Sequence, residues 1–316
     1  MNSISVVIPV YNAELTLNDL YKQLIPAMEQ VTANFEIIFV EDCGKDNSWN
    51  IIQELSKNDN RVKGLKLSKN YGQHNALLCG IRAAQYEMLL TMDDDLQNPV
   101  SEIQVLINKL AEGYDVVYGY PNKGQHGLFR NFASRVTKRA LQGAMGVKTA
   151  RNVSAFRAFK TQLREAFVDF NNPNISIDVL LTWATNNFAT VQVKHAPRAA
   201  GESNYTLKKL IVHALNLMTG FSALPLHLAS ALGVLFTLFG FGILAWVGAQ
   251  YFIYGASVPG FTFLASIIAI FSGAQLFVLG IFGEYLARIH FRSLNRPTYL
   301  VRESINVSRP SKVDTE

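Results

Sequence analysis

Hydrophobic and polar residues follow two different patterns along the chain. Up to about residue 210, short apolar runs alternate with amphipathic, charged segments, as they do in a water-soluble domain. From Leu210 to Gly283 there is no Lys, Arg, Asp or Glu. Because a soluble surface needs polar cover, the second region is expected to lie in a membrane. The less favoured alternative is a helical hairpin buried in a large soluble core.

The first region predicts an α/β fold. Strands are expected at 3–10, 35–40, 62–67, 86–92, 115–118 and, less clearly, 191–195. Helices are expected at 16–31, 46–57 with Asp46 as its cap, 74–84, 100–111 and 130–145. Repeated strand–helix units with continuous apolar strands indicate a mostly parallel, Rossmann-like sheet with helices on both faces. Ligands of such sheets bind at the carboxyl ends of the strands.

The second region predicts two membrane spans, at 228–254 and 261–283. Each is longer than the roughly 20 residues that cross a bilayer. The preceding segment, 206–226, carries Lys208 and Lys209 before an apolar face and predicts an amphipathic helix at the membrane surface. Glycines in the spans permit close helix packing, including packing between copies in a homo-oligomer, but do not count subunits.

These patterns divide the chain into four parts. Residues 1–205 form the expected catalytic domain, 206–226 the interface helices, 227–287 the two spans, and 288–316 a basic and then polar tail. From about Ser304 the tail is expected to be disordered. Basic residues flank both spans on the same side, so the positive-inside rule puts the N-terminal domain and both termini in the cytoplasm. The expected location is the plasma (bacterial inner) membrane.

Composition adds limits on compartment and partners. The formal net charge of +5 favours attraction to anionic lipid or to an anionic substrate. No basic run with interleaved aromatic residues occurs, so nucleic acid is not an expected partner. The two cysteines, Cys43 and Cys79, are not spaced as metal ligands and fit a reducing compartment. No signal peptide is expected, because the apolar run Ile4–Val10 is far too short for a signal core.

The strongest chemical signal is the run Asp93-Asp94-Asp95-Leu96-Gln97 directly after a predicted strand. Adjacent carboxylates repel one another, so their grouping favours a bound cation. If the segment is extended, Asp93 and Asp95 point to one side and Asp94 to the other. Two carboxylates on one side suit Mg²⁺ or Mn²⁺ with positions left for phosphate oxygens. The alternative is a solvated acidic turn that caps the next helix.

Two weaker signals follow the first two predicted strands. The run Pro9-Val10-Tyr11-Asn12-Ala13-Glu14 offers an aromatic wall for a base, with Asn12 or Glu14 available for its polar edge. Asp42 follows the second strand, where a carboxylate commonly accepts hydrogen bonds from a ribose. Each of these loops could equally be a simple turn.

Together the loops resemble those of a known family, the inverting family 2 (GT-A) transferases that make polyprenyl-phosphate sugars. The resemblance runs from residue 5 to about 299. It is carried by VVIPVYNAE (6–14), VEDCGKDNS (40–48), NYGQHNA (70–76), DDDLQNP (93–99), FR (156–157), RAAGESNY (198–205) and GEYLARI (283–289). NYGQHNA and GESNY look closest to the branch that transfers aminoarabinose to undecaprenyl phosphate.

The resemblance implies a metal-dependent hexosyl or aminosugar transferase. Its donor would be a nucleotide-sugar, with UDP as the expected nucleotide, and its acceptor a polyprenyl phosphate. It implies nucleotide-sugar contacts from Pro9, Tyr11, Asn12, Glu14, Asp42, Gln73, Asn75, Asp93 and Asp94. It implies a metal and diphosphate site at Asp93, Asp95 and Gln97, with Asp95 and Arg130 as the catalytic pair. Arg157, Arg198 and Ser203 would lie near the acceptor phosphate at the membrane-facing mouth.

The sequence departs from the family at three positions. Cys43 replaces the glycine of an Asp-Asp-Gly turn, Asn204 replaces a common lysine, and Ala155 stands where some relatives have aspartate. Ala155 leaves no obvious general base on its loop. A monoalkyl phosphate has its second pKa near ~6, so the acceptor is already mostly a dianion at neutral pH. The expected reaction is therefore one in-line displacement with inversion and little proton transfer by the protein.

Three other functions fit the sequence less well. A processive polysaccharide synthase shares the fold but carries a Gln-x-x-Arg-Trp motif, which is absent here. A non-catalytic membrane scaffold would have no reason to keep three adjacent carboxylates. A small transporter would need a polar pathway, which two uncharged spans do not offer.

Overall fold

The computed structural model describes residues 3–121, 152–172, 175–194, 196, 224–254, 261–294 and 296–307. The chain forms two compact units. The first comprises Met1–Ala214 with Asn295–Glu316, and the second comprises Leu215–Leu294. The expected helices at 130–145 and, up to residue 223, at 206–226 lie outside the described residues.

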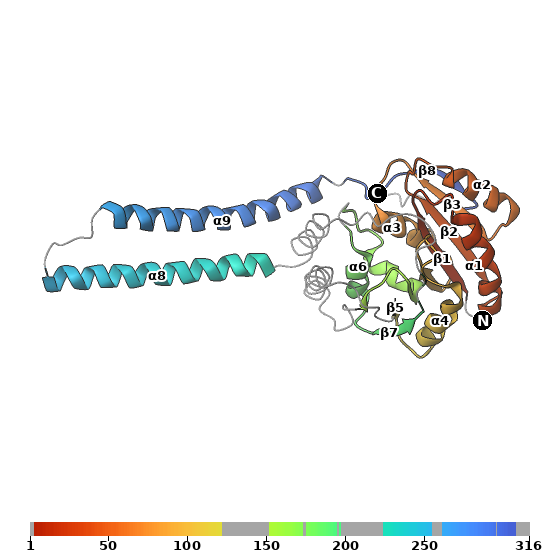
Figure 1. Cartoon of the computed structure of the whole chain (residues 1–316), viewed down its shortest axis with the longest axis horizontal. Coiled ribbons are helices and arrows are strands. Elements are labelled where there is room, and N and C mark those ends of the chain that lie inside the picture. Colours follow the sequence, from red (N-terminus) through yellow and green to blue (C-terminus); the bar gives the residue numbers. More distant parts are fainter. Residues whose placement is uncertain are drawn as a thin grey trace, which may run out of the picture. The chain divides into compact units, whose positions relative to one another are not determined.

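The first unit is built on an eight-stranded sheet in the order β7-β5-β6-β4-β1-β2-β3-β8. Figure 1 labels β1, β2, β3, β5, β7 and β8. The strands are β1 (Ile4–Val10), β2 (Phe35–Glu41), β3 (Val62–Leu67), β4 (Met88–Thr91), β5 (Val116–Pro121), β6 (Arg157–Lys160), β7 (Phe188–Val193) and β8 (Val301–Ile305). β1 pairs in parallel with β2 and β4, β2 with β3, and β5 with β7. The expected sheet is therefore confirmed in its central and β5–β7 pairings.

Two strands make the sheet mixed. β6 runs antiparallel to both β4 and β5, and β8 runs antiparallel to β3. The sequence predicted neither strand. β6 has only four residues, and β8 (VRESI) is largely polar because it is an exposed edge strand. The expectation of disorder from about Ser304 is wrong for residues 304–307, because β8 continues to Ile305 and Asn306 bonds the carbonyls of Ser56 and Val62.

Helices cover both faces of the sheet. One apolar cluster joins β1, β2 and β5 to α1 (Leu17–Val31), α2 (Ser48–Asn58) and α4 (Ile103–Ala111). The other joins the opposite face to α3 (Gln73–Ala83), α6 (Ile177–Ala184) and the 3-10 helix η3 (Thr161–Phe167). A second 3-10 turn, η1 (Val100–Glu102), precedes α4. Alternate β1 residues serve the two clusters: Val6 and Ile8 belong to the first, and Val7 to the second.

Helix α3 crosses β1 at Gly80. A Cβ atom at position 80 would lie 2.3 Å from Cγ1 of Val7 and 3.1 Å from Cγ2 of Val40. Gly80→Ala should therefore destabilise the domain by about 1–3 kcal/mol, the usual cost of overpacking a core. Thermal unfolding in detergent measures the loss. Gly248→Ala is the control, because its added Cβ meets nothing within 4 Å. Equal melting temperatures for both variants would contradict this packing.

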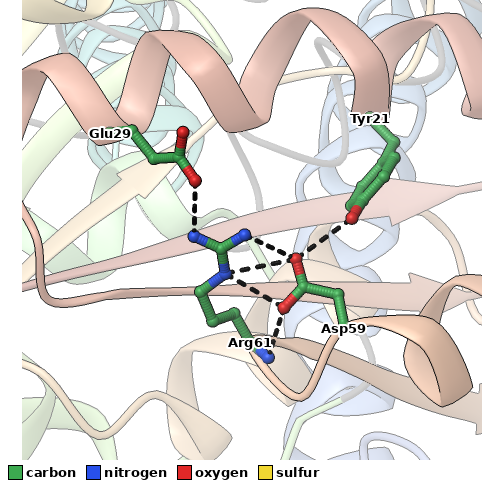
Figure 2. A network of polar contacts seen from close by, with 4 residues as sticks. All are labelled: Tyr21, Glu29, Asp59 and Arg61. Atoms are coloured by element: carbon green, nitrogen blue, oxygen red, sulfur yellow. Dashed lines mark hydrogen bonds and ion pairs between the residues drawn. The ribbon is translucent and has the colours of Figure 1, made fainter.

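A polar network ties α1 to the turn before β3 (Figure 2). The Arg61 guanidinium donates to Glu29 on α1 at 2.9 Å and to Asp59 Oδ2 at 2.8 Å. The Tyr21 hydroxyl donates to the same Asp59 oxygen at 3.0 Å. The hydrogen bonds from Arg61 lower the pKa of Asp59 below its usual value, against the opposing effect of burial.

This lowered pKa makes the network sensitive to acid. Its contribution is present above the unfolded pKa of Asp59, near ~3.9, and is lost as pH falls through the lower folded value. Arg61→Ala should reduce the melting temperature at neutral pH. The difference in melting temperature between the variant and the native protein should become smaller towards about pH 3. The effect should be under ~1 kcal/mol, because Arg61 is partly exposed and screened. A difference in melting temperature that stays constant with pH would contradict a stabilising pair between Arg61 and ionised Asp59.

The second unit is a pair of long helices, α8 (Leu224–Tyr254) and α9 (Phe261–Ser293). Each contains a stretch long and apolar enough to cross a membrane, Pro225–Ile253 with mean hydropathy 2.2 and Ile270–Ser293 with mean hydropathy 1.5. Within an 18-residue window of each stretch only 6% and 0% of the residues are buried, so neither resembles the core helix of a soluble protein. The helices meet around Phe271, which packs against Phe236 and Phe239 and lies 3.4 Å from the Cβ position of Gly240.

Candidate active site

A cavity of about 280 Å³ lies where β1, β2 and β4 end. This is the sheet edge at which the sequence predicted ligand binding. Its lining brings together segments that are far apart in the sequence. The lining residues are Pro9, Val10, Tyr11, Asp42, Asn70, Gly72, Gln73, Asp93, Asp94 and Asp95.

Tyr11 gives the cavity an aromatic wall. Its side chain is 49% exposed, and its backbone N–H donates to Asp94 Oδ2 at 3.2 Å. That bond links the loop after β1 to the loop after β4. A half-exposed ring beside a polar cavity is suited to stacking with a planar base.

Asn12 and Glu14 bond to a neighbouring loop. Asn12 has a left-handed backbone (φ 53°), and its Oδ1 accepts from the Lys45 N–H at 2.8 Å. Glu14 Oε2 accepts from the Asn47 N–H at 3.0 Å, and the Glu14 N–H donates to Asp46 Oδ2 at 2.9 Å. Asn12 and Glu14 are not among the cavity-lining residues. Their side chains hold the loops after β1 and β2 together, and their expected contacts with a nucleotide stay a prediction.

Asp42 supports the opposite wall. Only 4% of it is exposed, and its two oxygens accept from the N–H groups of Tyr71 and Gly72, both at 2.7 Å. Burial raises the pKa of Asp42 above its usual value, while the two backbone bonds oppose that rise. Asn75 also braces this wall, because its Nδ2 donates to the Tyr71 carbonyl at 2.7 Å.

The Asp93–Asp95 segment bends where the sequence predicted an extended chain. Residue 96 has φ 59°, and residues 94–96 form a bend, so all three carboxylates line the same cavity. The segment is therefore not extended, which is the condition under which Asp94 was expected to point away from Asp93 and Asp95. Gln73 Nε2 donates to Asp93 Oδ1 at 2.6 Å, and the Gln97 N–H donates to Asp95 Oδ1 at 3.2 Å.

These carboxylates give the cavity a strongly negative character. Burial, and then the charges of Asp93 and Asp95, raise the pKa of Asp94 to about 7. A positive ion between these carboxylates would relieve that repulsion. Perturbed carboxyl groups of this kind gather at functional sites.

The donor set fits a hard divalent cation that shares its coordination with a ligand. Within the described ranges, no three His, Cys, Asp or Glu side chains form a ready metal cage. Mg²⁺ commonly binds through one or two carboxylates and completes its shell with water and phosphate oxygens. Asp93 and Asp95 therefore suit a cation that arrives with a diphosphate. The backbone N–H of Gln97 bonds to Asp95, but Gln97 does not line the cavity.

Arg157 lies beneath this site rather than in it. Only 1% of it is exposed, and its guanidinium forms an ion pair with Asp178 at the start of α6. Its Nε donates to Thr91 Oγ1 at 3.0 Å, and Tyr118 donates its hydroxyl proton to Asp178 at 3.1 Å. A contact with an acceptor phosphate would require Arg157 to leave these partners, so the geometry favours a supporting role.

Three expected site residues cannot be placed, and three residues at or beneath the site were not predicted. Arg130, Arg198 and Ser203 lie outside the described residues. Asn70 and Gly72 line the cavity but were not singled out, and Asp178 was missed because a lone aspartate in an apolar segment resembles a helix cap. Gly72 could have been predicted from its position directly before a helix. Its φ of 90° is a backbone conformation that favours glycine.

Comparison with known proteins identifies the family of the chain and similar proteins. The sequence pattern described as "Glycosyl transferase family 2" matches residues 5–168. The undecaprenyl-phosphate 4-deoxy-4-formamido-L-arabinose transferase of Proteus mirabilis is 33% identical over 100% of this chain and 98% of its own length. The protein of the same name from Shewanella sediminis is 33% identical over 95% of this chain and 92% of its own length.

The fold also matches solved structures. Glucosyl-3-phosphoglycerate synthase from Mycobacterium tuberculosis, crystallised with Mn²⁺ and UDP-glucose, superposes with a TM-score of 0.50. The match covers 69% of this chain and 77% of that protein, at 15% sequence identity. At that identity the likeness concerns the fold, which is the expected GT-A arrangement.

Proposed function

Because this chain belongs to glycosyl transferase family 2, we propose that it transfers a sugar from a UDP-sugar to undecaprenyl phosphate with inversion at the anomeric carbon. The observation that carries the proposal is the cavity that joins Tyr11 to three carboxylates at the carboxyl end of the sheet. The acceptor follows from the two relatives that match nearly the whole chain, both described as undecaprenyl-phosphate transferases.

The donor would enter this cavity with its base against Tyr11. Its diphosphate would then lie towards Asp93 and Asp95, which would hold a Mg²⁺ or Mn²⁺ ion, and that ion would neutralise charge on the departing nucleotide. Gln73 orients Asp93 through its 2.6 Å hydrogen bond. The loop of Tyr71 and Gly72, held by Asp42, closes the other side of the pocket.

The acceptor needs little help from a protein base. With a second pKa near ~6, a monoalkyl phosphate is mostly dianionic at neutral pH and can attack the anomeric carbon directly. One carbon–oxygen bond forms to the acceptor phosphate as the bond to the diphosphate breaks, which inverts the configuration. The leaving nucleotide takes the electron pair. Ala155 is compatible with this reaction, because no proton has to be removed.

The apolar helices α8 and α9 are consistent with an acceptor that lies in a membrane. We propose that they anchor the protein in the bacterial inner membrane, with the catalytic domain and both termini in the cytoplasm. Basic residues before α8 and at the end of α9 support this orientation through the positive-inside rule.

A transfer assay with a donor panel tests the proposal. The detergent-solubilised protein is incubated with undecaprenyl phosphate and radiolabelled UDP-glucose, UDP-N-acetylglucosamine, UDP-4-deoxy-4-formamido-L-arabinose or GDP-mannose. A UDP-sugar should give a labelled product that extracts into organic solvent, with an inverted anomeric linkage by NMR. A product of retained configuration would contradict the mechanism, and no lipid product from any donor would favour a non-catalytic scaffold.

A further inference from the structure

The chain returns to the catalytic domain immediately after the second apolar helix. α9 ends at Ser293, and residues 298–306, which we name the C-terminal strap, belong to the same compact unit as the sheet. We propose that this strap is a positioning element that holds one wall of the donor cavity in its binding conformation. The inference rests on the proposed donor site, and it concerns residues that have no direct contact with the cavity.

Both ends of the strap make side-chain contacts with the sheet unit. At its start, Thr298 is 2% exposed, and Arg82 Nη1 contacts the Thr298 hydroxyl at 3.5 Å and the Tyr299 hydroxyl at 3.4 Å. The Arg82 guanidinium also lies 5.5 Å from the centre of the Tyr299 ring. At its end, Asn306 Nδ2 donates to the carbonyls of Ser56 and Val62 at 2.8 and 3.0 Å.

Between these ends the strap extends the sheet. β8 pairs with β3, with Lys66 opposite Glu303 and Leu67 opposite Val301. Trp49 Nε1 donates to Glu303 Oε2 at 3.1 Å. Ordering a segment costs conformational entropy, which its contacts must offset. The specific hydrogen bonds of this polar edge strand therefore indicate that it is held in place on the sheet and is not a flexible linker.

The strap reaches the cavity wall through a short series of contacts. The Ser68 N–H donates to the Leu300 carbonyl at 2.9 Å, just where β3 ends. The Ser68 hydroxyl shares a 3.0 Å hydrogen bond with the Tyr71 hydroxyl. The Tyr71 and Gly72 N–H groups are the two that Asp42 holds.

That wall belongs to the donor cavity. Asn70, Gly72 and Gln73 line it, and Gln73 in turn holds Asp93. Releasing the strap should allow the 68–73 segment to leave the conformation that these hydrogen bonds hold. When the competent conformation is populated in only a fraction of molecules, the apparent dissociation constant rises by the inverse of that fraction.

The test uses the full chain and two readouts. Tyr299→Ala removes the ring and hydroxyl that Arg82 holds, Tyr299→Phe keeps the ring, and Arg302→Ala is the control on an exposed strap residue (64% exposed side chain). Tyr299→Ala should raise the KM for the UDP-sugar about five- to tenfold, with little change in kcat or in the KM for undecaprenyl phosphate. Tyr299→Phe should restore most of the donor KM, and Arg302→Ala should match the native protein.

The second readout is hydrogen exchange in the nucleotide-free protein. Tyr299→Ala should speed exchange at the amides of Ser68, Tyr71 and Gly72, while strand β1 stays protected. Asn306→Ala, a milder release of the other end, should give a smaller change in the same direction. Unchanged exchange at these three amides, or a rise in both KM values together, would overturn the inference. Absence of transfer by the native chain would count against the proposed function instead, because the exchange measurement needs no substrate.

Discussion

Replacing Asp95 with asparagine should lower kcat/KM for sugar transfer about a hundred- to a thousandfold. The amide oxygen can still accept the Gln97 N–H, which lies 3.2 Å from Asp95 Oδ1, so the bend should persist. The substitution would remove one negative charge from the proposed cation site and so weaken stabilisation of the departing diphosphate. Losses of this size are typical when one electrostatic group of an active site is removed.

The comparison needs a control for lost negative charge. Asp169→Asn supplies it, because Asp169 is exposed and distant in sequence from the cavity loops. Its kcat/KM should equal that of the native protein. Raising the Mn²⁺ concentration should recover part of the activity of Asp95→Asn if the defect is in cation binding. An Asp95→Asn enzyme with native activity would exclude the assigned cation site.

Replacing Arg157 with methionine should destabilise the catalytic domain by about 3–5 kcal/mol, the usual cost of leaving one partner of a buried ion pair unpaired. Arg157 is 1% exposed and Asp178 is 7% exposed, so solvent cannot take the place of the missing guanidinium. Thr91 loses its hydrogen bond from Arg157 Nε in the same variant. Thermal and chemical unfolding in detergent measure the loss.

Two further variants separate this cause from a general packing defect. In the double variant Arg157→Met/Asp178→Asn the buried charge is gone, while the amide oxygen introduced at position 178 can still accept from Tyr118, so part of the stability should return. Lys160→Met removes a more exposed partner, paired with Asp115 at 2.7 Å, and should cost less than ~1 kcal/mol. Equal losses for Arg157→Met and Lys160→Met would contradict the buried pair.

The central strands could be predicted from sequence because their patterns are simple. β1 and β2 are mostly apolar runs that are buried on both faces. β3 (VKGLKL) carries two lysines, but its valine and leucines are buried. The predicted bounds of all three strands lie within a residue of the observed ones. The edge strand β8 could not be predicted because its three central residues, Arg302, Glu303 and Ser304, are polar and exposed, so the segment resembles a polar tail. Its partner, β3, is more than 200 residues earlier, so no local signal reports the pairing.

The site was predictable as a set of loops but not in its internal geometry. The carboxylate run after β4 could be predicted as a site because three adjacent carboxylates repel one another unless a cation or hydrogen-bond donors offset their charge. Which way they point depends on the left-handed residue Leu96 and on the Tyr11 N–H that Asp94 accepts. Likewise, Glu14 and Asn12 look like ligand groups in sequence. They bond across to residues 45–47, a contact that exists only once β1 and β2 are paired.

One measurement tests the central claim most directly: formation of labelled undecaprenyl-phosphate sugar from a UDP-sugar by the native chain, with Mg²⁺, with EDTA, and with EDTA followed by excess Mn²⁺. The account predicts a lipid-extractable product with Mg²⁺, its loss with EDTA, and its return with Mn²⁺. Product that forms at the same rate in EDTA would contradict a cation at Asp93 and Asp95. A folded protein that hydrolyses or ignores every UDP-sugar in all three conditions would contradict the transfer itself.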